Sequence, residues 1–329
     1  GQSLLVPDAY ADPRFFRDAD RQTGFRTRSI LCVPLERDGK EIGVLQVLNP
    51  LHRDSFDADD LTAFEAYGTM AATAIYKLRA IERQRERERI EQEFTFARDI
   101  QKSFMPETLP ERDGIQFATA YRPARFVGGD FYDVIEVRKG QFFFVIGDVS
   151  GKGMPAALLM AQALSTLRLI LHSRMSPARA LNRWNDLLCQ QTIRGMFITA
   201  LLGRVDTAQR QIELASAGHC HPICARLDAP PHEIPVPGGP PLGIAPGRMY
   251  RSVTAALGVG DWLINYTDGL SESFNDAREP LHPAGVGELL RGPFADAAAV
   301  VRALELGERV HRGEADPHDD LTMLVFGFR

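Results

Sequence analysis

A long charged segment in the first third of the chain sets the strongest limit on the fold. Residues 77–93 contain no glycine or proline and alternate basic with acidic side chains. Arg89 and Glu93, for example, stand four positions apart, where opposite charges support an α-helix. The segment predicts a solvated connecting helix, so the chain divides into a part before it and a part after it.

Apolar residues continue the helical spacing on both sides of the charged segment. They are Leu61, Phe64, Tyr67, Ala71 and Ile75 before it, and Ile90, Phe94, Ala97, Ile100 and Phe104 after it. The helix is therefore predicted to start at the capping-type sequence that follows Asp57 and to end before Pro106. The sequence allows two interpretations of this helix: a surface helix packed on one domain, or a two-stranded coiled coil whose heptad pattern is interrupted at residues 82–89.

Length and composition agree with two folded domains. At roughly 150 residues per domain, 329 residues make about two domains, and 44% hydrophobic with 25% charged residues excludes disorder over most of the chain. The chain has a net charge of -5, so it lacks the excess of basic residues that is typical of nucleic-acid-binding proteins. Four scattered cysteines form no disulfide framework, and we find neither a secretory leader nor an apolar run that could span a membrane. We therefore expect a cytoplasmic protein.

The part before the connecting helix predicts a β-hairpin. Residues 29–35 and 42–48 have the composition of strands, and Asp38 with Gly39 forms the Asp-Gly turn between them.

The part after the connecting helix, about 220 residues, predicts one mixed domain. Strands are expected at residues 116–121, 131–137, 141–146, 196–205, 211–217, 262–266 and 321–328, and helices at 155–171, 176–189, 284–290 and 295–310. Strands that pair in hairpins, with helices set apart in pairs, indicate an α+β fold in which helices pack on a sheet sandwich.

Acidic residues stand beside glycine or another acid at four strand ends. They are Asp130 in Gly-Gly-Asp, Asp148 in Gly-Asp-Val-Ser-Gly, Asp268 in Thr-Asp-Gly, and Asp319 in Asp-Asp-Leu-Thr. Glycine permits close backbone approach, so carboxylates from separate strands can converge. Convergent carboxylates repel unless a cation lies among them, and oxygen ligands favour Mg²⁺ or Mn²⁺ over zinc. One Asp-Gly pair alone indicates only a turn, but four together predict a metal site.

The same motifs carry a family resemblance. They are VGGDFYD around Asp130, GDVSGKGMPAALLMA around Asp148, AGHCHP at 217–222, GGPPLGI at 238–244, YTDGLSE around Asp268 and DDLTMLVF at 319–326. Residues 93–329 are similar to bacterial SpoIIE-type (RsbU-like) serine phosphatases of the metal-dependent PPM, or protein phosphatase 2C-like, superfamily. Residues 1–80 resemble the second half of a GAF sensor domain.

The resemblance implies three segments and a fold. A partial α/β GAF domain would occupy residues 1–80, and the phosphatase domain would occupy residues 111–329. Between them, residues 81–110 would form a helical linker, for which a coiled coil is one of the two interpretations. The implied fold is α+β: a PPM-type β-sandwich flanked by helix pairs.

The resemblance also implies two Mn²⁺ or Mg²⁺ ions at one end of the sandwich. Asp148 would bridge both ions, and the carbonyl of Val149 would complete the shell of one. The other predicted catalytic ligands are the carboxylates of Asp130, Asp268 and Asp319. Asp320 is the alternative to Asp319, because the superfamily has an acid followed by Asn or Asp at this place. Two such ions would lower the pKa of a shared water toward about 7, which would supply a hydroxide for in-line attack on phosphorus.

The implied function is hydrolysis of phosphoserine or phosphothreonine on a protein. By resemblance, the substrate is an anti-anti-sigma factor with a STAS fold in a partner-switching sigma-factor pathway, and the enzyme is a homodimer through its linker helix. The GAF part would receive an unknown small-molecule or protein signal; neither nucleic acid nor a membrane is an expected partner. The alternatives are a non-catalytic phosphoprotein-binding module and a GAF ligand-sensing scaffold.

Three groups of residues bear on the leaving-group acid and on an alternative zinc site. Ser150 stands where many eukaryotic relatives have a histidine proposed to protonate the leaving group, and a hydroxyl is no substitute near neutral pH. His219 is either a replacement acid or a residue that orders its turn. The cluster of His219, Cys220, His221 and Cys224 is too closely spaced to wrap a tetrahedral zinc ion.

Overall fold

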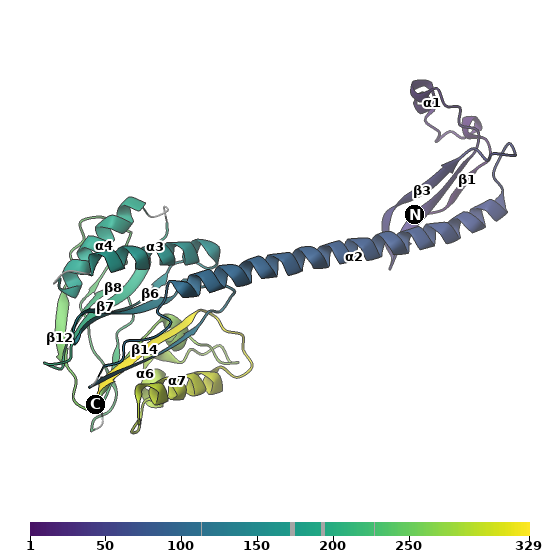
Figure 1. Cartoon of the computed structure of the whole chain (residues 1–329). Coiled ribbons are helices and arrows are strands. Elements are labelled where there is room, and N and C mark those ends of the chain that lie inside the picture. The colour runs from purple at the N-terminus through teal and green to yellow at the C-terminus, as the bar shows by residue number, and fades with distance from the viewer. Residues whose placement is uncertain (113, 172–174, 192–194, 227) are drawn as a thin grey trace. The chain divides into compact units, whose positions relative to one another are not determined.

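The computed structural model describes residues 1–112, 114–171, 175–191, 195–226 and 228–329 (Figure 1). The chain separates into two compact units, Gly1–Gln92 and Glu93–Arg329. The predicted linker, residues 81–110, lies across this division. In the described ranges, every helix is too short or too polar to cross a membrane.

The first unit contains a small antiparallel sheet in the order β1–β2–β3. Its elements are β1 (Leu4–Val6), a 3₁₀ turn at Ala9–Ala11, α1 (Arg17–Thr23), β2 (Ile30–Arg37) and β3 (Lys40–Leu48). The predicted hairpin is confirmed: Cys32 pairs with Gln46, and Asp38 and Gly39 form the turn with positive φ angles. The sequence analysis missed β1 and α1, which are too short to show a period.

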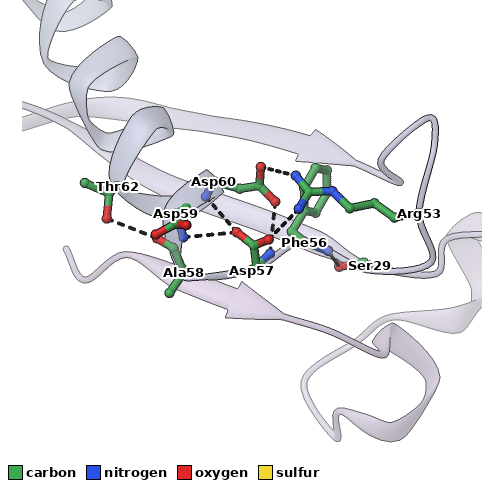
Figure 2. Close-up of polar contacts among 8 residues, drawn as sticks. All are labelled: Ser29, Arg53, Phe56, Asp57, Ala58, Asp59, Asp60 and Thr62. Atoms are coloured by element: carbon green, nitrogen blue, oxygen red, sulfur yellow. Dashed lines mark hydrogen bonds and ion pairs between the residues drawn. The ribbon is translucent and has the colours of Figure 1, made fainter.

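Helix α2 (Ala58–Ser103) is one continuous helix of 46 residues, as the sequence predicted. Its first turn is capped reciprocally (Figure 2): the Asp57 carboxylate accepts hydrogen bonds from the backbone N–H groups of Asp59 and Asp60, both at 3.0 Å. The Asp60 carboxylate in turn accepts the Asp57 N–H at 2.9 Å. Arg53 forms ion pairs with both carboxylates. These contacts fix the start of the helix, because they satisfy backbone donors that have no partner within it.

The second unit is built on two sheets. The five-stranded sheet has the order β10–β9–β13–β14–β4, and the six-stranded sheet has the order β11–β8–β7–β6–β5, with its sixth strand, β12, paired to β8. The strands of the first sheet are β4 (Ile115–Arg122), β9 (Ile223–Ala225), β10 (His232–Glu233), β13 (Trp262–Tyr266) and β14 (Leu321–Phe328). Those of the second are β5 (Phe131–Arg138), β6 (Gln141–Val149), β7 (Ile198–Asp206), β8 (Gln211–Ala217), β11 (Gly238–Gly239) and β12 (Ser252–Ala256).

Strand β6 shows how the layers are assembled. Its alternate residues Phe142, Phe144 and Ile146 belong to a core shared with Leu324 and the rest of the five-stranded sheet. Side chains of the opposite parity, such as Phe143, instead belong to a core with α3 and α4. Because successive strand residues face opposite sides, a strand that is apolar on both faces must be covered on both.

Helix pairs cover the outer face of each sheet (Figure 1). Helices α3 (Met154–Ile170) and α4 (Pro177–Gln191) pack on the six-stranded sheet, and α6 (His282–Leu289) and α7 (Ala297–Arg312) belong to the core on the five-stranded sheet. The predicted α+β sandwich flanked by helix pairs is confirmed. The short helix α5 (Asp268–Ser271), which the sequence analysis missed, carries one of the predicted site residues.

Candidate active site

Two of the predicted carboxylates come from one hairpin of the six-stranded sheet. Asp130 immediately precedes β5, and Asp148 is the second-last residue of β6. Phe131 and Gly147 face each other across this antiparallel pair, whereas the connecting turn lies at the other end of the strands. Both aspartates therefore lie at the open end of the hairpin.

The other predicted carboxylates lie at the matching end of the five-stranded sheet. Asp268 begins α5 just after β13, and Asp319 and Asp320 come just before β14. The pairing continues one residue beyond the end of β13, where Thr267 N–H donates to the carbonyl of Thr322 in β14 at 3.1 Å. The antiparallel arrangement thus brings residues more than fifty positions apart to one place.

Two threonines join the sheets at Asp130. The hydroxyls of Thr267 and Thr322 donate to the same Asp130 oxygen, Oδ2, at 2.7 and 2.6 Å. All three residues are buried. A buried carboxylate that accepts two hydroxyl donors is held in one orientation, so the second Asp130 oxygen, Oδ1, has a fixed position.

Glycine allows the backbone to approach the acidic groups. A Cβ atom at Gly129 would lie 2.7 Å from the Val149 carbonyl oxygen and 2.9 Å from Asp148 Oδ1, which is closer than real Cβ atoms come. A Cβ atom at Gly269 would overlap the backbone carbonyl of Asp320. The two glycines therefore let the strand ends meet, which is the role that the Asp-Gly pattern predicted.

The carboxylates repel one another. Burial and, after it, the charge of Asp148 raise the pKa of Asp130 well above its ordinary value. Burial followed by the charges of Asp268 and Asp319 raises the pKa of Asp148 to about 7. Burial and then Glu272 and Asp319 raise the pKa of Asp268. Burial is the larger cause in each case, and the repulsion that follows it indicates that these carboxylates lie close enough to interact, an arrangement that a cation would stabilise.

Asp319 and Asp320 have different surroundings. Asp320 is 8% exposed, and its carboxylate accepts the backbone N–H groups of Ala124 at 2.8 Å and Gly129 at 2.7 Å. The Asp319 side chain is 35% exposed and forms an ion pair with Lys152, whose Nζ lies 2.9 Å from Oδ2. Asp320 thus braces the loop that carries Asp130, whereas Asp319 has an accessible carboxylate. This difference favours Asp319 as the metal ligand.

The donor set fits a hard divalent cation by its chemistry. It consists of aspartate oxygens and the Val149 carbonyl, and the Asp148 and Asp268 carboxyls carry raised pKa values that a bound cation would lower. Within the described residues, no three His, Cys, Asp or Glu side chains already form a ligand set around one point. One reason is visible at Asp319, whose carboxylate faces an ammonium group instead.

Ser150 and His219 both have structural partners. Ser150 exchanges two hydrogen bonds with Phe197, one through its hydroxyl oxygen and one through its N–H, both at 2.9 Å. His219 is buried, and its Nδ1 lies 2.9 Å from the Thr199 hydroxyl. Burial lowers the pKa of His219 to about 4, so the ring is neutral at pH 7 and holds no extra proton for a leaving group. These contacts favour the interpretation that His219 orders its turn.

Sequence reasoning missed the residues that support the carboxylates. Thr267 and Thr322 belong to the quoted motifs, and their place one residue before Asp268 and two residues after Asp320 was the available signal. Lys152 also belongs to a quoted motif, but its own segment does not indicate an ion pair with Asp319, which lies 167 positions further along the chain.

Comparison with known proteins places both units among described families. The Stage II sporulation protein E (SpoIIE) family model matches residues 138–329, and the GAF domain model matches residues 1–75. The chain is 25% identical over 255 residues to protein IcfG of Synechocystis, covering 69% of this chain but only 40% of IcfG. It is 27% identical over 234 residues to the phosphoserine phosphatase RsbU of Bacillus subtilis, covering 70% of this chain and 67% of RsbU.

Solved structures show the same fold. The SiaA-PP2C domain of Pseudomonas aeruginosa superposes with a TM-score of 0.63 at 22% identity, covering 74% of this chain and 98% of that domain. The RsbU and RsbW domains of Rv1364c from Mycobacterium tuberculosis superpose with a TM-score of 0.58 at 24% identity, covering 67% of this chain and 61% of that one.

Proposed function

The chain belongs to the SpoIIE family, and on this premise we propose that it is a metal-dependent protein serine/threonine phosphatase. The observation that carries the proposal is that four aspartates stand at matching ends of the two sheets and interact through their charges. They are Asp130, Asp148, Asp268 and Asp319. A site of this kind is suited to a phosphate ester, because its bound cations would attract the phosphoryl oxygens.

These aspartates and the Val149 carbonyl are the groups that would hold two Mn²⁺ or Mg²⁺ ions. When bound, such ions supply Lewis acidity and make water a nucleophile near neutral pH. The protein's part is positioning. Thr267 and Thr322 orient Asp130, and Asp320 holds the loop through the Gly129 N–H. Buried hydrogen bonds of this kind keep a donor set in place without reorganisation during the reaction.

We propose a phosphorylated anti-anti-sigma factor with a STAS fold as the substrate. Support comes from similarity to RsbU, a phosphoserine phosphatase, and from the fold shared with a structure that joins RsbU and RsbW domains. The chain would then act as the phosphatase of a partner-switching pathway that controls a sigma factor.

Regulation through the GAF part and α2 completes the proposal. Helix α2 is continuous from the GAF-matched residues into the second unit, and it leaves Leu78, Ile81 and Ile90 exposed in a single chain. Exposed apolar residues along a helix are the surface on which a second copy can pack. We therefore propose a homodimer through α2 that responds to a signal received by the GAF part.

The test is phosphate release from a phosphoserine-bearing STAS protein. Activity should require Mn²⁺ or Mg²⁺ and should fall by about a thousandfold or more in Asp148→Asn, since the shared carboxylate is lost. The matched control is Asp228→Asn, which removes an exposed carboxylate remote in sequence from the four aspartates and should leave the rate unchanged. Full activity in EDTA would overturn the metal-dependent mechanism. Tight binding of the phosphoprotein without turnover would instead identify a binding module.

A further inference from the structure

Lys152 reaches from the loop after β6 to the segment before β14. Its Nζ lies 2.9 Å from Asp319 Oδ2 and donates to the His318 carbonyl at 2.9 Å. The Lys152 side chain is 39% exposed and the Asp319 side chain is 35% exposed, so solvent reaches both partners. One ammonium thus joins two segments that each carry a predicted ligand, Asp148 on one side and Asp319 on the other.

The ammonium compensates charge within the acidic cluster. The ion pair with Asp319 places one positive charge beside a predicted ligand. A divalent cation at Asp319 would also balance the negative charge of the carboxylates, with twice the positive charge of the ammonium group. The two cations therefore compete for one carboxylate, because an oxygen held by an ammonium cannot fully coordinate a metal.

We infer that Lys152 is a tethered counter-ion of Asp319 that a divalent cation must displace, so that Lys152 weakens metal binding at this carboxylate. The inference rests on the proposed metal site and adds a residue that sets its affinity. The His318 carbonyl gives the ammonium a second acceptor, so displacement from Asp319 leaves Lys152 with a partner. Lys152 is accordingly a positioning residue and not a catalytic one.

The first experiment measures Mn²⁺ binding without substrate, from the paramagnetic resonance signal of the free ion. Lys152→Met should bind Mn²⁺ about tenfold more tightly than the parent at the position that includes Asp319, because both the competing pair and the local repulsion are gone. Lys152→Arg keeps the charge and should bind like the parent. The control is Lys139→Met, an exposed lysine in the turn at the opposite end of β5 and β6, which should have no effect.

A second measurement, thermal unfolding, keeps the inference testable if Lys152→Met folds less well. In EDTA the variant should melt below the parent, since the carboxylates lose a counter-ion. Saturating Mn²⁺ should raise its midpoint by more than it raises that of the parent, because tighter binding to the native state stabilises it further. The effect of Lys152→Met on Mn²⁺ affinity should also vanish in an Asp319→Asn background.

The outcomes separate this inference from the proposed function. Failure of the parent to bind Mn²⁺ would overturn the metal site, and with it the proposed mechanism. Binding of Mn²⁺ by the parent, with equal or weaker binding by Lys152→Met, would leave that site intact and overturn the counter-ion role. An unchanged effect of Lys152→Met in the Asp319→Asn background would overturn that role as well.

Discussion

Gln101 and Gly128 exchange two hydrogen bonds. The Gln101 Nε2 donates to the Gly128 carbonyl at 2.6 Å, and the Gly128 N–H donates to Gln101 Oε1 at 3.2 Å. Gln101 is only 4% exposed and lies in the last turn of α2, while Gly128 stands two residues before Asp130. The end of the long helix is therefore bonded directly to the loop that carries a predicted metal ligand.

Replacement of Gln101 by leucine should destabilise the second unit by about 1–3 kcal/mol, because the buried Gly128 N–H and carbonyl would lose their partners. Denaturant unfolding followed by tryptophan fluorescence would measure the loss, since both tryptophans lie in this unit. The control is Gln92→Leu, an exposed glutamine on the same helix, which should change stability by less than about 0.5 kcal/mol. Equal stabilities of the two variants would contradict the structural role of the Gln101 pair.

Replacement of Ser150 by alanine should reduce the phosphatase activity far less than replacement of Asp148 does. The Ser150 hydroxyl accepts the Phe197 N–H, and a hydroxyl is too weak an acid to protonate a leaving group. We expect kcat to fall less than about tenfold, compared with a loss of orders of magnitude in Asp148→Asn. Steady-state rates with the phosphoprotein would decide, and equal losses in the two variants would assign Ser150 a direct part in the reaction.

Protonation of His219 should make the fold sensitive to acid. Burial holds the native pKa at about 4, whereas the ordinary value is 6.5. Between these values the unfolded chain binds a proton that the native state does not, so stability is present above pH 6.5 and is lost as the pH falls toward 4. Between pH 6.5 and pH 4 the free energy of unfolding should fall by about 3 kcal/mol.

Thermal unfolding at pH 7 and pH 5 would test this dependence. His219→Asn should lose less stability than the parent over that interval, because the titrating ring is gone. The control, exposed His52→Asn, should follow the parent. A parallel decline of all three proteins would show that other groups account for the acid sensitivity.

Long and strongly patterned segments were predictable from the sequence because local periodicity determines them. The apolar run at residues 141–146 predicted the strand that the structure shows as β6, and Asp57 with Asp60 marked the start of α2 within one residue. Short elements such as β12 and the four-residue α5 carry no period, and tertiary pairing decides them.

The sequence predicted which acidic residues belong to the site, but it did not predict their surroundings or their contacts. Asp319 and Asp320 are chemically identical neighbours, and only the fold shows that Asp320 is enclosed by backbone N–H groups while Asp319 meets Lys152. The threonine pair on Asp130 likewise depends on β13 and β14 lying side by side. A local segment can mark a residue as part of a motif, but it does not show which distant residue that side chain will contact.

Small phosphate esters should be poor substrates compared with a folded phosphoprotein. The four motifs around the aspartates contain no arginine, and Arg125 is the nearest arginine to Asp130 in the sequence. Without an arginine that could bind the phosphate through two hydrogen bonds, a high rate depends on binding energy from other parts of the substrate. We expect kcat/KM for p-nitrophenyl phosphate to lie at least about a hundredfold below that for a phosphorylated STAS protein. Comparable values would show that the phosphate group alone is recognised.

The last prediction concerns communication along α2. A continuous helix can transmit a rotation or a change of pairing, whereas a flexible linker cannot. Insertion of Gly-Gly between Arg87 and Glu88 introduces two residues that each cost a helix interior about 1 kcal/mol. The break lies in the charged part of α2, away from the bonded end at Gln101, so Mn²⁺ binding should be unchanged while coupling between the units is lost.

Coupling can be measured in the full chain without knowing the signal. Leu31→Ala leaves a cavity in place of a buried side chain of β2 in the GAF-matched unit and should change the phosphatase rate severalfold when α2 is intact. In the Gly-Gly variant the same substitution should have no effect, because the helix no longer carries the perturbation. Light scattering at micromolar concentration should show a dimer for the parent. A monomeric parent, or an equal response to Leu31→Ala with and without the insertion, would contradict transmission through a paired α2.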